Sequence, residues 1–197
     1  MYMIRVNKLE KFKFIYTKID GLYVIESKIF QDKRGYFLEY YNKKEFYNNG
    51  LTMNFVQDNQ SKSTQNVLRG LHFQTKNPQG KLVRAIKGAV YDVAVDLRIG
   101  SPTFGQYEIV LLSEENKRQL YIPVGFAHGF LVKSKEAIFT YKCSDFYNPE
   151  HESGIIWNDK SINIDWPIDN EDSLIISEKD KNLKTLHEVD IPFKYEG

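Results

Sequence analysis

The stretch that decides the predicted fold runs from Lys81 to Arg98 and reads KLVRAIKGAVYDVAVDLR. Its alternation of apolar with polar or small residues predicts two β-strands that meet near Lys87 and Gly88. Successive side chains of a strand point to opposite faces, so the second strand has two different faces. The pattern fits the wall of a barrel with a polar lumen, and equally a sheet with one wet face. The apolar face would carry Tyr91, Val93, Val95 and Leu97, and the small, acidic face Val90, Asp92, Ala94 and Asp96.

The same rhythm of short apolar alternations, separated by Gly, Asn and Pro, extends over most of the chain. Aromatic residues make up 14% of the sequence, which suits strands better than helices. The sequence therefore predicts an all-β sandwich or barrel. Helix signals are few, and the clearest is a short helix over 43–49, with Asn42 as its N-cap, Glu45 three residues later and Gly50 at its far end.

At 197 residues the chain is long enough for one domain with its own core. We expect an N-terminal arm at 1–20, a β-barrel at 21–176, and a C-terminal helix and tail at 177–197 that contributes to the site. Such an arm often pairs with a partner subunit, because the edge of a sheet must be covered.

The charge balance excludes two classes of partner. Lys and Arg together number 27 and Asp and Glu 26, for a net charge of +1, so there is no basic field for nucleic acid and no cationic face for a membrane. The single cysteine, Cys143, excludes an internal disulfide, and we interpret it as a packed thiol. No signal peptide or membrane span is evident, so we expect a soluble, cytoplasmic protein.

A second stretch, RGLHFQ at 69–74, carries the first candidate for chemistry. An imidazole titrates at roughly pH 6.5, so His72 could act as a base, although a silent core histidine is a strong alternative. Arg69 and Lys81 could supply positive charge to an anionic substrate or a developing enolate, or could be scattered surface charges. The glycine at Gly70 would let the backbone approach a ligand closely.

His128 lies in IPVGFAHGF at 122–130, where Pro and two Gly predict a bent strand with its imidazole in a cavity. His72 and His128 are both candidate metal ligands. The sequence has only four histidines, no H-x-H pair, and Gln74 two residues after His72, so we expect no metal.

Two further residues have competing interpretations. Tyr141 alternates with Phe139, which is typical of a core tyrosine, but a tyrosine facing a histidine base could return a proton to a carbanion. Ser177 and Asp180 form the start of a helix that would carry Leu183 and Leu186 on one side. Asp180 could instead orient His72, but the local sequence favours the cap.

Taken together, the motifs closely resemble the dTDP-4-dehydrorhamnose 3,5-epimerase family over about residues 21–183. No single motif is specific, but so many in the same order are. The matching segments are 30–37, 56–59, 67–74, 79–84, 91–98, 101–105, 115–120, 122–130, 141–142, 156–159 and 165–167.

The resemblance implies a cupin-type double-stranded β-helix, that is, a jelly-roll barrel, and a role for each candidate residue. By resemblance His72 is the general base with Asp180 as its partner, Tyr141 is the general acid, and Lys81 stabilises the C4 enolate. The expected contacts to the nucleotide sugar are Arg34, Glu39, Gln57, Arg69, His128, Glu152 and Lys179, with Phe30 and Tyr147 stacking on the thymine.

The implied reaction is a cofactor-free conversion of dTDP-4-dehydro-6-deoxy-D-glucose to dTDP-4-dehydro-L-rhamnose in dTDP-L-rhamnose biosynthesis, by a homodimer. Three alternatives remain open. The first is an epimerase that inverts only C3 or only C5 of a related nucleotide-linked 4-keto-deoxy sugar. The second is a metal-dependent cupin, and the third is a carbohydrate-binding barrel without catalysis.

Overall fold

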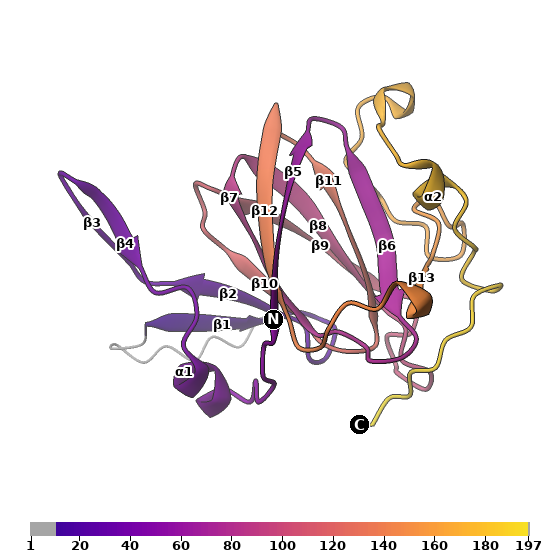
Figure 1. Cartoon of the computed structure of the whole chain (residues 1–197), viewed down its shortest axis with the longest axis horizontal. Coiled ribbons are helices and arrows are strands. Elements are labelled where there is room, and N and C mark those ends of the chain that lie inside the picture. The colour runs from indigo at the N-terminus through magenta and orange to yellow at the C-terminus, as the bar shows by residue number, and fades with distance from the viewer. Residues whose placement is uncertain (1–10, 197) are drawn as a thin grey trace.

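The computed structural model describes residues 11–196, and these form two antiparallel sheets that face each other as a barrel (Figure 1). The six-stranded sheet has the order β1-β2-β10-β7-β12-β5 and the five-stranded sheet the order β13-β6-β11-β8-β9. The prediction of an all-β jelly-roll barrel with few short helices is confirmed. The strands are β1 Phe12–Tyr16, β2 Tyr23–Ser27, β3 Ile29–Asp32, β4 Gly35–Leu38, β5 Gln57–Thr64, β6 Leu68–Gln74, β7 Lys81–Lys87, β8 Ala89–Asp96, β9 Tyr107–Ser113, β10 Gln119–Ile122, β11 Phe126–Val132, β12 Glu136–Cys143 and β13 Glu152–Gly154.

The two strands predicted between Lys81 and Arg98 are β7 and β8, with the break at Gly88. They do not form a hairpin, because β7 belongs to the six-stranded sheet and β8 to the five-stranded one. The chain changes sheets at Gly88, which has a φ of +69°. A Cβ there would lie 2.1 Å from the carbonyl oxygen of Glu136, so only glycine fits this crossing.

Most residues on both faces of β8 are buried, so of the two alternatives the wet face is wrong and the barrel wall is correct, although its lumen is not the polar one expected. Val90 and Ala94 pack between the two sheets, in a core that includes Phe130 and Phe139. The lumen is therefore apolar around the buried carboxylate of Asp92. The opposite face, with Val93, Val95 and Leu97, packs in a second cluster with Trp166, Leu186 and Phe193 from the C-terminal part of the chain.

The N-terminal strand β1 pairs along its whole length with β2, from Phe12 opposite Ser27 to Tyr16 opposite Tyr23. Residues 1–10 of the predicted arm lie outside the described residues. The hairpin of β3 and β4 extends away from the barrel (Figure 1). It is followed by α1, Lys43–Asn48, whose N-cap Asn42 accepts hydrogen bonds from the N–H groups of Lys44 and Glu45, as the sequence predicts.

The C-terminal part covers the outer face of the five-stranded sheet, and its helix is shorter than expected. Helix α2, Glu178–Lys181, begins after Ser177 as predicted, but Leu183 and Leu186 lie beyond its last residue. The remaining helical turns are η1, Pro149–His151, and η2, Glu171–Ser173. No helix among residues 11–196 is long and apolar enough to cross a membrane.

Candidate active site

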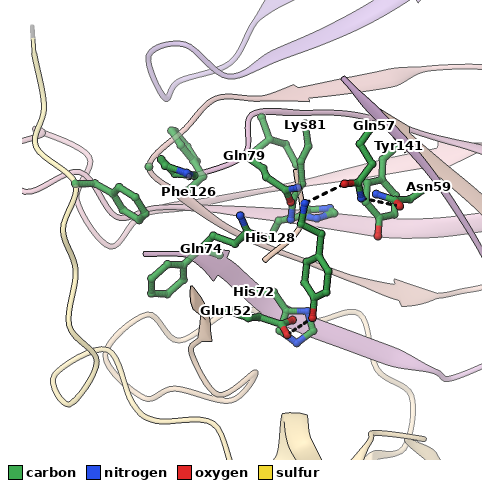
Figure 2. Close-up of a pocket in the computed structure, with 16 residues that line it drawn as sticks. Gln57, Asn59, His72, Gln74, Gln79, Lys81, Phe126, His128, Tyr141 and Glu152 are labelled. Atoms are coloured by element: carbon green, nitrogen blue, oxygen red, sulfur yellow. Dashed lines mark hydrogen bonds between the residues drawn. The ribbon is translucent and has the colours of Figure 1, made fainter. Parts of the chain in front are cut away.

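A cavity of about 310 Å³ opens at the end of the barrel where β7 and β11 begin and β6 and β12 end. Three of the four predicted catalytic residues line it: His72 from β6, Lys81 from β7 and Tyr141 from β12. Figure 2 shows these side chains together with His128. The other polar residues in the wall are Gln57, Asn59, Gln74, Gln79, Tyr147 and Glu152.

The fourth predicted catalytic residue, Asp180, reaches His72 from α2. The Nε2 of His72 lies 2.8 Å from Oδ1 of Asp180, and Oδ2 accepts a hydrogen bond of 3.1 Å from the N–H of Gly70. Burial by itself raises the pKa of Asp180, but the hydrogen bonds from His72, Gly70 and Ser177 together with the charge of His72 hold it below its usual value. An ionised Asp180 makes Nε2 the protonated nitrogen of His72, which leaves Nδ1 as the basic atom.

Asp180 can belong to the helix cap and also be the partner of His72, because the two roles use different atoms. Its backbone N–H donates to the hydroxyl of Ser177, at 3.1 Å, and so completes the helix cap. Its carboxylate turns to His72. The helix cap therefore positions the residue, and the side chain remains available to the site.

A second histidine–carboxylate pair lies deeper in the lumen. Nε2 of His128 lies 2.9 Å from one carboxylate oxygen of Asp92 and 3.1 Å from the other, and both residues are buried. Burial raises the pKa of Asp92 and lowers that of His128. The sequence places Asp92 on the acidic face of its strand but assigns it no role; the available signal is a carboxylate between the apolar residues Val90 and Ala94 on the lumen face.

Lys81 and Tyr141 lie on neighbouring strands of the six-stranded sheet. Within residues 11–196, neither the ammonium of Lys81 nor the hydroxyl of Tyr141 has a hydrogen-bond partner, so both are available to a ligand. Burial lowers the pKa of Lys81, opposed by the acidic groups of Cys143, Asp92 and Glu152. Burial also raises the pKa of Tyr141, which keeps the phenol protonated as a proton donor must be.

The interpretation of Cys143 as a packed thiol is confirmed. It is fully buried, and burial raises its pKa, so the thiolate is disfavoured.

A chain of polar contacts connects four of the predicted nucleotide-sugar ligands at the mouth of the cavity. The Oε1 of Gln57 accepts a hydrogen bond of 2.9 Å from the N–H of Tyr147. The hydroxyl of Tyr147 donates to Glu152 at 2.7 Å, and Glu152 forms an ion pair with Lys179. Arg69 does not line the cavity, and its Nε donates a hydrogen bond of 3.2 Å to the hydroxyl of Ser63.

Two glutamines of the wall anchor the loops around the cavity, which the sequence does not reveal. The Gln74 amide nitrogen donates to the carbonyl oxygen of Asn77 at 2.7 Å, and its oxygen accepts from the N–H of Asn148 at 2.9 Å. Gln79 donates to the carbonyl oxygen of Asp145 at 2.8 Å. The sequence indicates only that Gln74 is no metal ligand; its surroundings show a structural use.

Five predicted ligands do not line the cavity of their own chain: Arg69 and Lys179, and three that lie on or beside the β3–β4 hairpin, Phe30, Arg34 and Glu39. Phe30 and Arg34 lie on the β3–β4 hairpin, which extends away from the barrel. Phe30 is half exposed, and Arg34 forms an ion pair of 2.6 Å with Asp32. Glu39 follows the hairpin and contacts Lys11 and Asn42.

The glycine of the RGLHFQ stretch serves a different purpose from the one predicted. A Cβ on Gly70 would lie 2.6 Å from the Cα of Gly129, and a Cβ on Gly129 would lie 2.6 Å from the carbonyl oxygen of Arg69. Two backbones therefore approach each other here, where the sequence predicts the approach of a ligand. The close approach coincides with an irregularity in the register between β6 and β11, next to the pair His72 and His128.

Known proteins with this combination of fold and site give a consistent result. The sequence model of the family described as dTDP-4-dehydrorhamnose 3,5-epimerase matches residues 16–188. The dTDP-4-dehydrorhamnose 3,5-epimerase of Methanothermobacter thermautotrophicus is 55% identical over 180 residues, covering 91% of this chain and 97% of its own. The Pseudomonas aeruginosa enzyme of the same name is 53% identical over 173 residues, covering 87% of this chain and 94% of its own.

A solved structure agrees in both sequence and fold. The dTDP-6-deoxy-D-glucose-3,5-epimerase of Legionella pneumophila, in complex with dTDP-4-keto-L-rhamnose, superposes with a TM-score of 0.91 at 49% identity, covering 94% of this chain and all of its own. The resemblance seen in the sequence is thus confirmed, and with it the expectation of an isomerase. This chain belongs to the dTDP-4-dehydrorhamnose 3,5-epimerase family.

Proposed function

We propose that this chain inverts both C3 and C5 of dTDP-4-dehydro-6-deoxy-D-glucose to give dTDP-4-dehydro-L-rhamnose, without a cofactor. The observation that supports it most is that a histidine–carboxylate pair, a protonated tyrosine and an unpaired ammonium meet at one cavity. These are the groups needed to remove a proton beside a ketone, to hold the resulting negative charge, and to return a proton.

The first step uses His72 and Lys81. Nδ1 of His72 takes the proton from the carbon next to the C4 ketone, and the electron pair of the broken C–H bond moves into a C=C bond as the ketone oxygen becomes an enolate. Asp180 stabilises the imidazolium that forms, because it already accepts the Nε2 proton. The ammonium of Lys81 stabilises the enolate oxygen, and such a preorganised donor is worth about 10²–10³ in rate.

The second step uses Tyr141. Its phenol donates a proton to the opposite face of the same carbon, and the enolate electrons return to form the new C–H bond. The carbon is then inverted. The phenolate and the imidazolium exchange protons with water before the second carbon reacts, so both new hydrogens come from solvent.

The remaining polar residues suit the nucleotide part. Gln57, Tyr147 and Glu152 line the cavity, Lys179 pairs with Glu152, and we propose that these four, with Arg69, receive the diphosphate and the base. Arginine and lysine there match the negative charge of a diphosphate. His128 lines the same cavity as Lys81 and is held by Asp92, and we assign it to the sugar.

A homodimer accounts for the residues that are far from their own pocket. The β3–β4 hairpin extends away from the barrel (Figure 1) and carries the exposed aromatic residues Phe30, Tyr36 and Phe37. We infer that the hairpin of each chain extends to the mouth of the other chain's pocket, which would bring Phe30 and Arg34 to the nucleotide. The cytoplasmic location expected from the sequence also stays a proposal.

The test is incubation of the protein with dTDP-4-dehydro-6-deoxy-D-glucose in D₂O, with NMR detection at C3 and C5 separately. Deuterium at both carbons, with the L-rhamno product, is the expected result. Label and inversion at one carbon only would identify a C3- or C5-specific epimerase. Binding without label would leave a carbohydrate-binding barrel, and loss of activity on chelation would indicate a metal-dependent cupin.

A further inference from the structure

The C-terminal tail returns to the catalytic end of the barrel. The carbonyl of Phe193 accepts a hydrogen bond of 2.9 Å from the N–H of Ile99, and the N–H of Tyr195 donates to the carbonyl of Ile99 at 3.0 Å. Residues 189–195 lie beyond the last residue, 188, that the family's sequence model matches. The tail is nevertheless part of the cavity, because Phe193 lines it.

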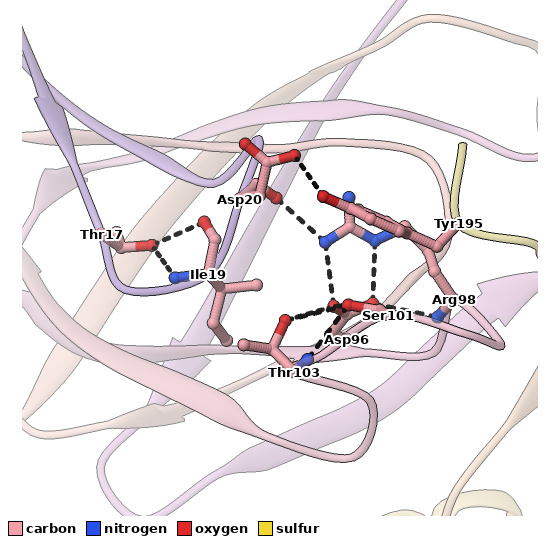
Figure 3. A network of polar contacts seen from close by, with 8 residues as sticks. All are labelled: Thr17, Ile19, Asp20, Asp96, Arg98, Ser101, Thr103 and Tyr195. Carbon is pink, nitrogen blue, oxygen red and sulfur yellow. Dashed lines mark hydrogen bonds and ion pairs between the residues drawn. The ribbon is translucent and has the colours of Figure 1, made fainter. Parts of the chain in front are cut away.

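The tail is held by Arg98, whose guanidinium lies between two aromatic rings. It lies 5.0 Å from the ring centre of Tyr195 and 4.7 Å from that of Phe126, which also lines the cavity. Figure 3 shows the same guanidinium bound to Asp96, with Nε at 2.8 Å and Nη2 at 2.9 Å, and to the carbonyl of Asp20 at 3.0 Å. Burial alone raises the pKa of Asp96, but its bonds to Arg98, Ser101 and Thr103 hold it below the usual value, so the ion pair stays charged.

Gly125 provides the space for this arrangement. Its φ is +92°, and a Cβ there would lie 2.6 Å from the Cγ of Arg98 and 3.5 Å from the Cβ of Phe193. The loop before Phe126, the arginine and the tail are therefore packed as one unit.

Phe193 makes this part of the cavity wall apolar. It is 7% exposed and lies edge-to-face on Phe73, with 5.6 Å between ring centres. With Phe126 and Ile122 it forms an apolar end of a cavity whose other walls are polar. In Figure 2, Phe126 lies on the other side of Lys81 and His128 from Gln57 and Asn59.

We propose that Phe193 is a specificity-determining residue, and that the apolar end it completes receives the methyl group at C6 of the sugar. This inference rests on the proposed function. The methyl group is the sugar's one apolar substituent, and it is attached to C5, one of the two carbons that react. It must therefore lie next to the catalytic groups, and Phe126 precedes His128 by two residues on the same side of β11.

The same wall disfavours a sugar that carries a hydroxyl at C6. The side chains of Phe73, Ile122, Phe126 and Phe193 offer such a hydroxyl no hydrogen bond. The amide nitrogen of Gln74 in the same lining already donates to the carbonyls of Asn77 and Phe146, so the hydroxyl would lose its hydrogen bonds to water without replacement. Hydrophobic pockets reject an added hydroxyl by about 10²-fold. We therefore expect a preference of that order for the 6-deoxy substrate.

The experiment compares kcat/KM for dTDP-4-dehydro-6-deoxy-D-glucose and for the same nucleotide sugar with a hydroxymethyl group at C5, in the wild type, Phe193→Ala, Phe193→Leu and Ile191→Ala. Ile191 also packs in the C-terminal apolar cluster but does not line the cavity, so it controls for general loosening of the tail. In Phe193→Ala we expect the preference for the 6-deoxy substrate to fall about 10-fold, mostly because kcat/KM for the 6-deoxy substrate falls. Phe193→Leu, which keeps the site filled, should lie between this variant and the wild type, and Ile191→Ala should keep the wild-type preference.

An equal loss on both substrates, or an unchanged preference in Phe193→Leu as well as in Phe193→Ala, would overturn this assignment. If Phe193→Ala does not fold, Phe193→Leu alone decides, and an unchanged preference there overturns it. A wild type that labels neither substrate in D₂O contradicts the proposed function instead. The two failures are thus distinguishable.

Discussion

Nε2 of His72 and Oδ1 of Asp180 lie 2.8 Å apart, although 108 positions separate the two residues in the sequence. Ser177 is the N-cap of α2, and its hydroxyl accepts a hydrogen bond from the backbone N–H of Asp180. The Asp180 carboxylate is therefore not needed for the cap and points at β6. The carboxylate also binds the N–H of Gly70, two residues before His72. Its orientation is therefore fixed from both sides.

Replacing Asp180 by Asn should lower kcat about 10²–10⁴-fold and leave KM nearly unchanged, because the amide cannot stabilise the imidazolium but does not contact the substrate. Steady-state kinetics and exchange in D₂O measure the effect. Asp190→Asn, at an exposed position, is the control. If Asp180→Asn only lowers the melting temperature, the carboxylate has a purely structural role.

Replacing Tyr141 by Phe should separate the two halves of the reaction. Proton removal by His72 needs no phenol, so solvent deuterium should still enter at C3 and C5 while inversion falls by about 10²-fold or more. NMR of the sugar in D₂O distinguishes exchange with retention from exchange with inversion. Tyr23→Phe, in the aromatic cluster on the outer side of the sheet, is the control. Normal turnover by Tyr141→Phe would show that this tyrosine only packs.

Replacing Lys81 by Met should lower the rate about 10²–10³-fold, since the enolate loses its ammonium. It should also raise the stability at neutral pH. Burial lowers the pKa of Lys81 in the folded state, so the folded chain binds this proton less well than the unfolded chain. The buried ammonium therefore lowers the free energy of unfolding, and this cost decreases as the pH rises through the folded pKa. Methionine removes this cost, and urea denaturation measures the gain in the free energy of unfolding. The control is Lys160→Met, at an exposed lysine.

The same shift gives the wild type a pH profile. The protonated ammonium is the active form, so kcat/KM should fall on the alkaline side at a pH below the usual lysine pKa. An alkaline limb that persists unchanged in Lys81→Met would assign the titration to another group.

Local pattern was sufficient for the elements of this fold but not for their arrangement. The bounds of β7, β8 and α1 follow from periodicity and capping residues, because these are interactions within a few positions of the chain. At Gly88 the chain passes from one sheet to the other against a distant carbonyl, that of Glu136, so no local signal reports that β7 and β8 lie in different sheets. The burial of both faces of β8 depends equally on C-terminal residues such as Trp166.

For the candidate site, too, the local sequence predicts some features and the fold determines the others. The chemistry of His72, Lys81 and Tyr141 could be proposed from their residue types, but their meeting at one cavity is a property of the barrel. Phe193 had no signal at all, because an apolar residue in a tail is most often packing. Its role depends on Arg98 bringing the tail to the cavity.

The close backbone approach of Gly70 and Gly129 gives the last prediction. Gly129 does not need a left-handed backbone; its constraint is contact, since a Cβ would lie 2.6 Å from the carbonyl oxygen of Arg69. Gly129→Ala must push β6 and β11 apart, which we expect to cost about 1–3 kcal/mol in the free energy of unfolding. Because His72 and His128 are register partners on these two strands, kcat should also fall.

Gly50→Ala is the matched control. Gly50 has a φ of +87° and open space around its Cα, so alanine there is strained by its own backbone, at a cost of about 1–2 kcal/mol. It follows α1 and is remote from the cavity in the fold. The two variants should therefore lose similar stability in urea denaturation, and only Gly129→Ala should lose turnover under conditions where both are folded. Equal turnover in the two would mean that the spacing of β6 and β11 does not set the geometry of the histidines.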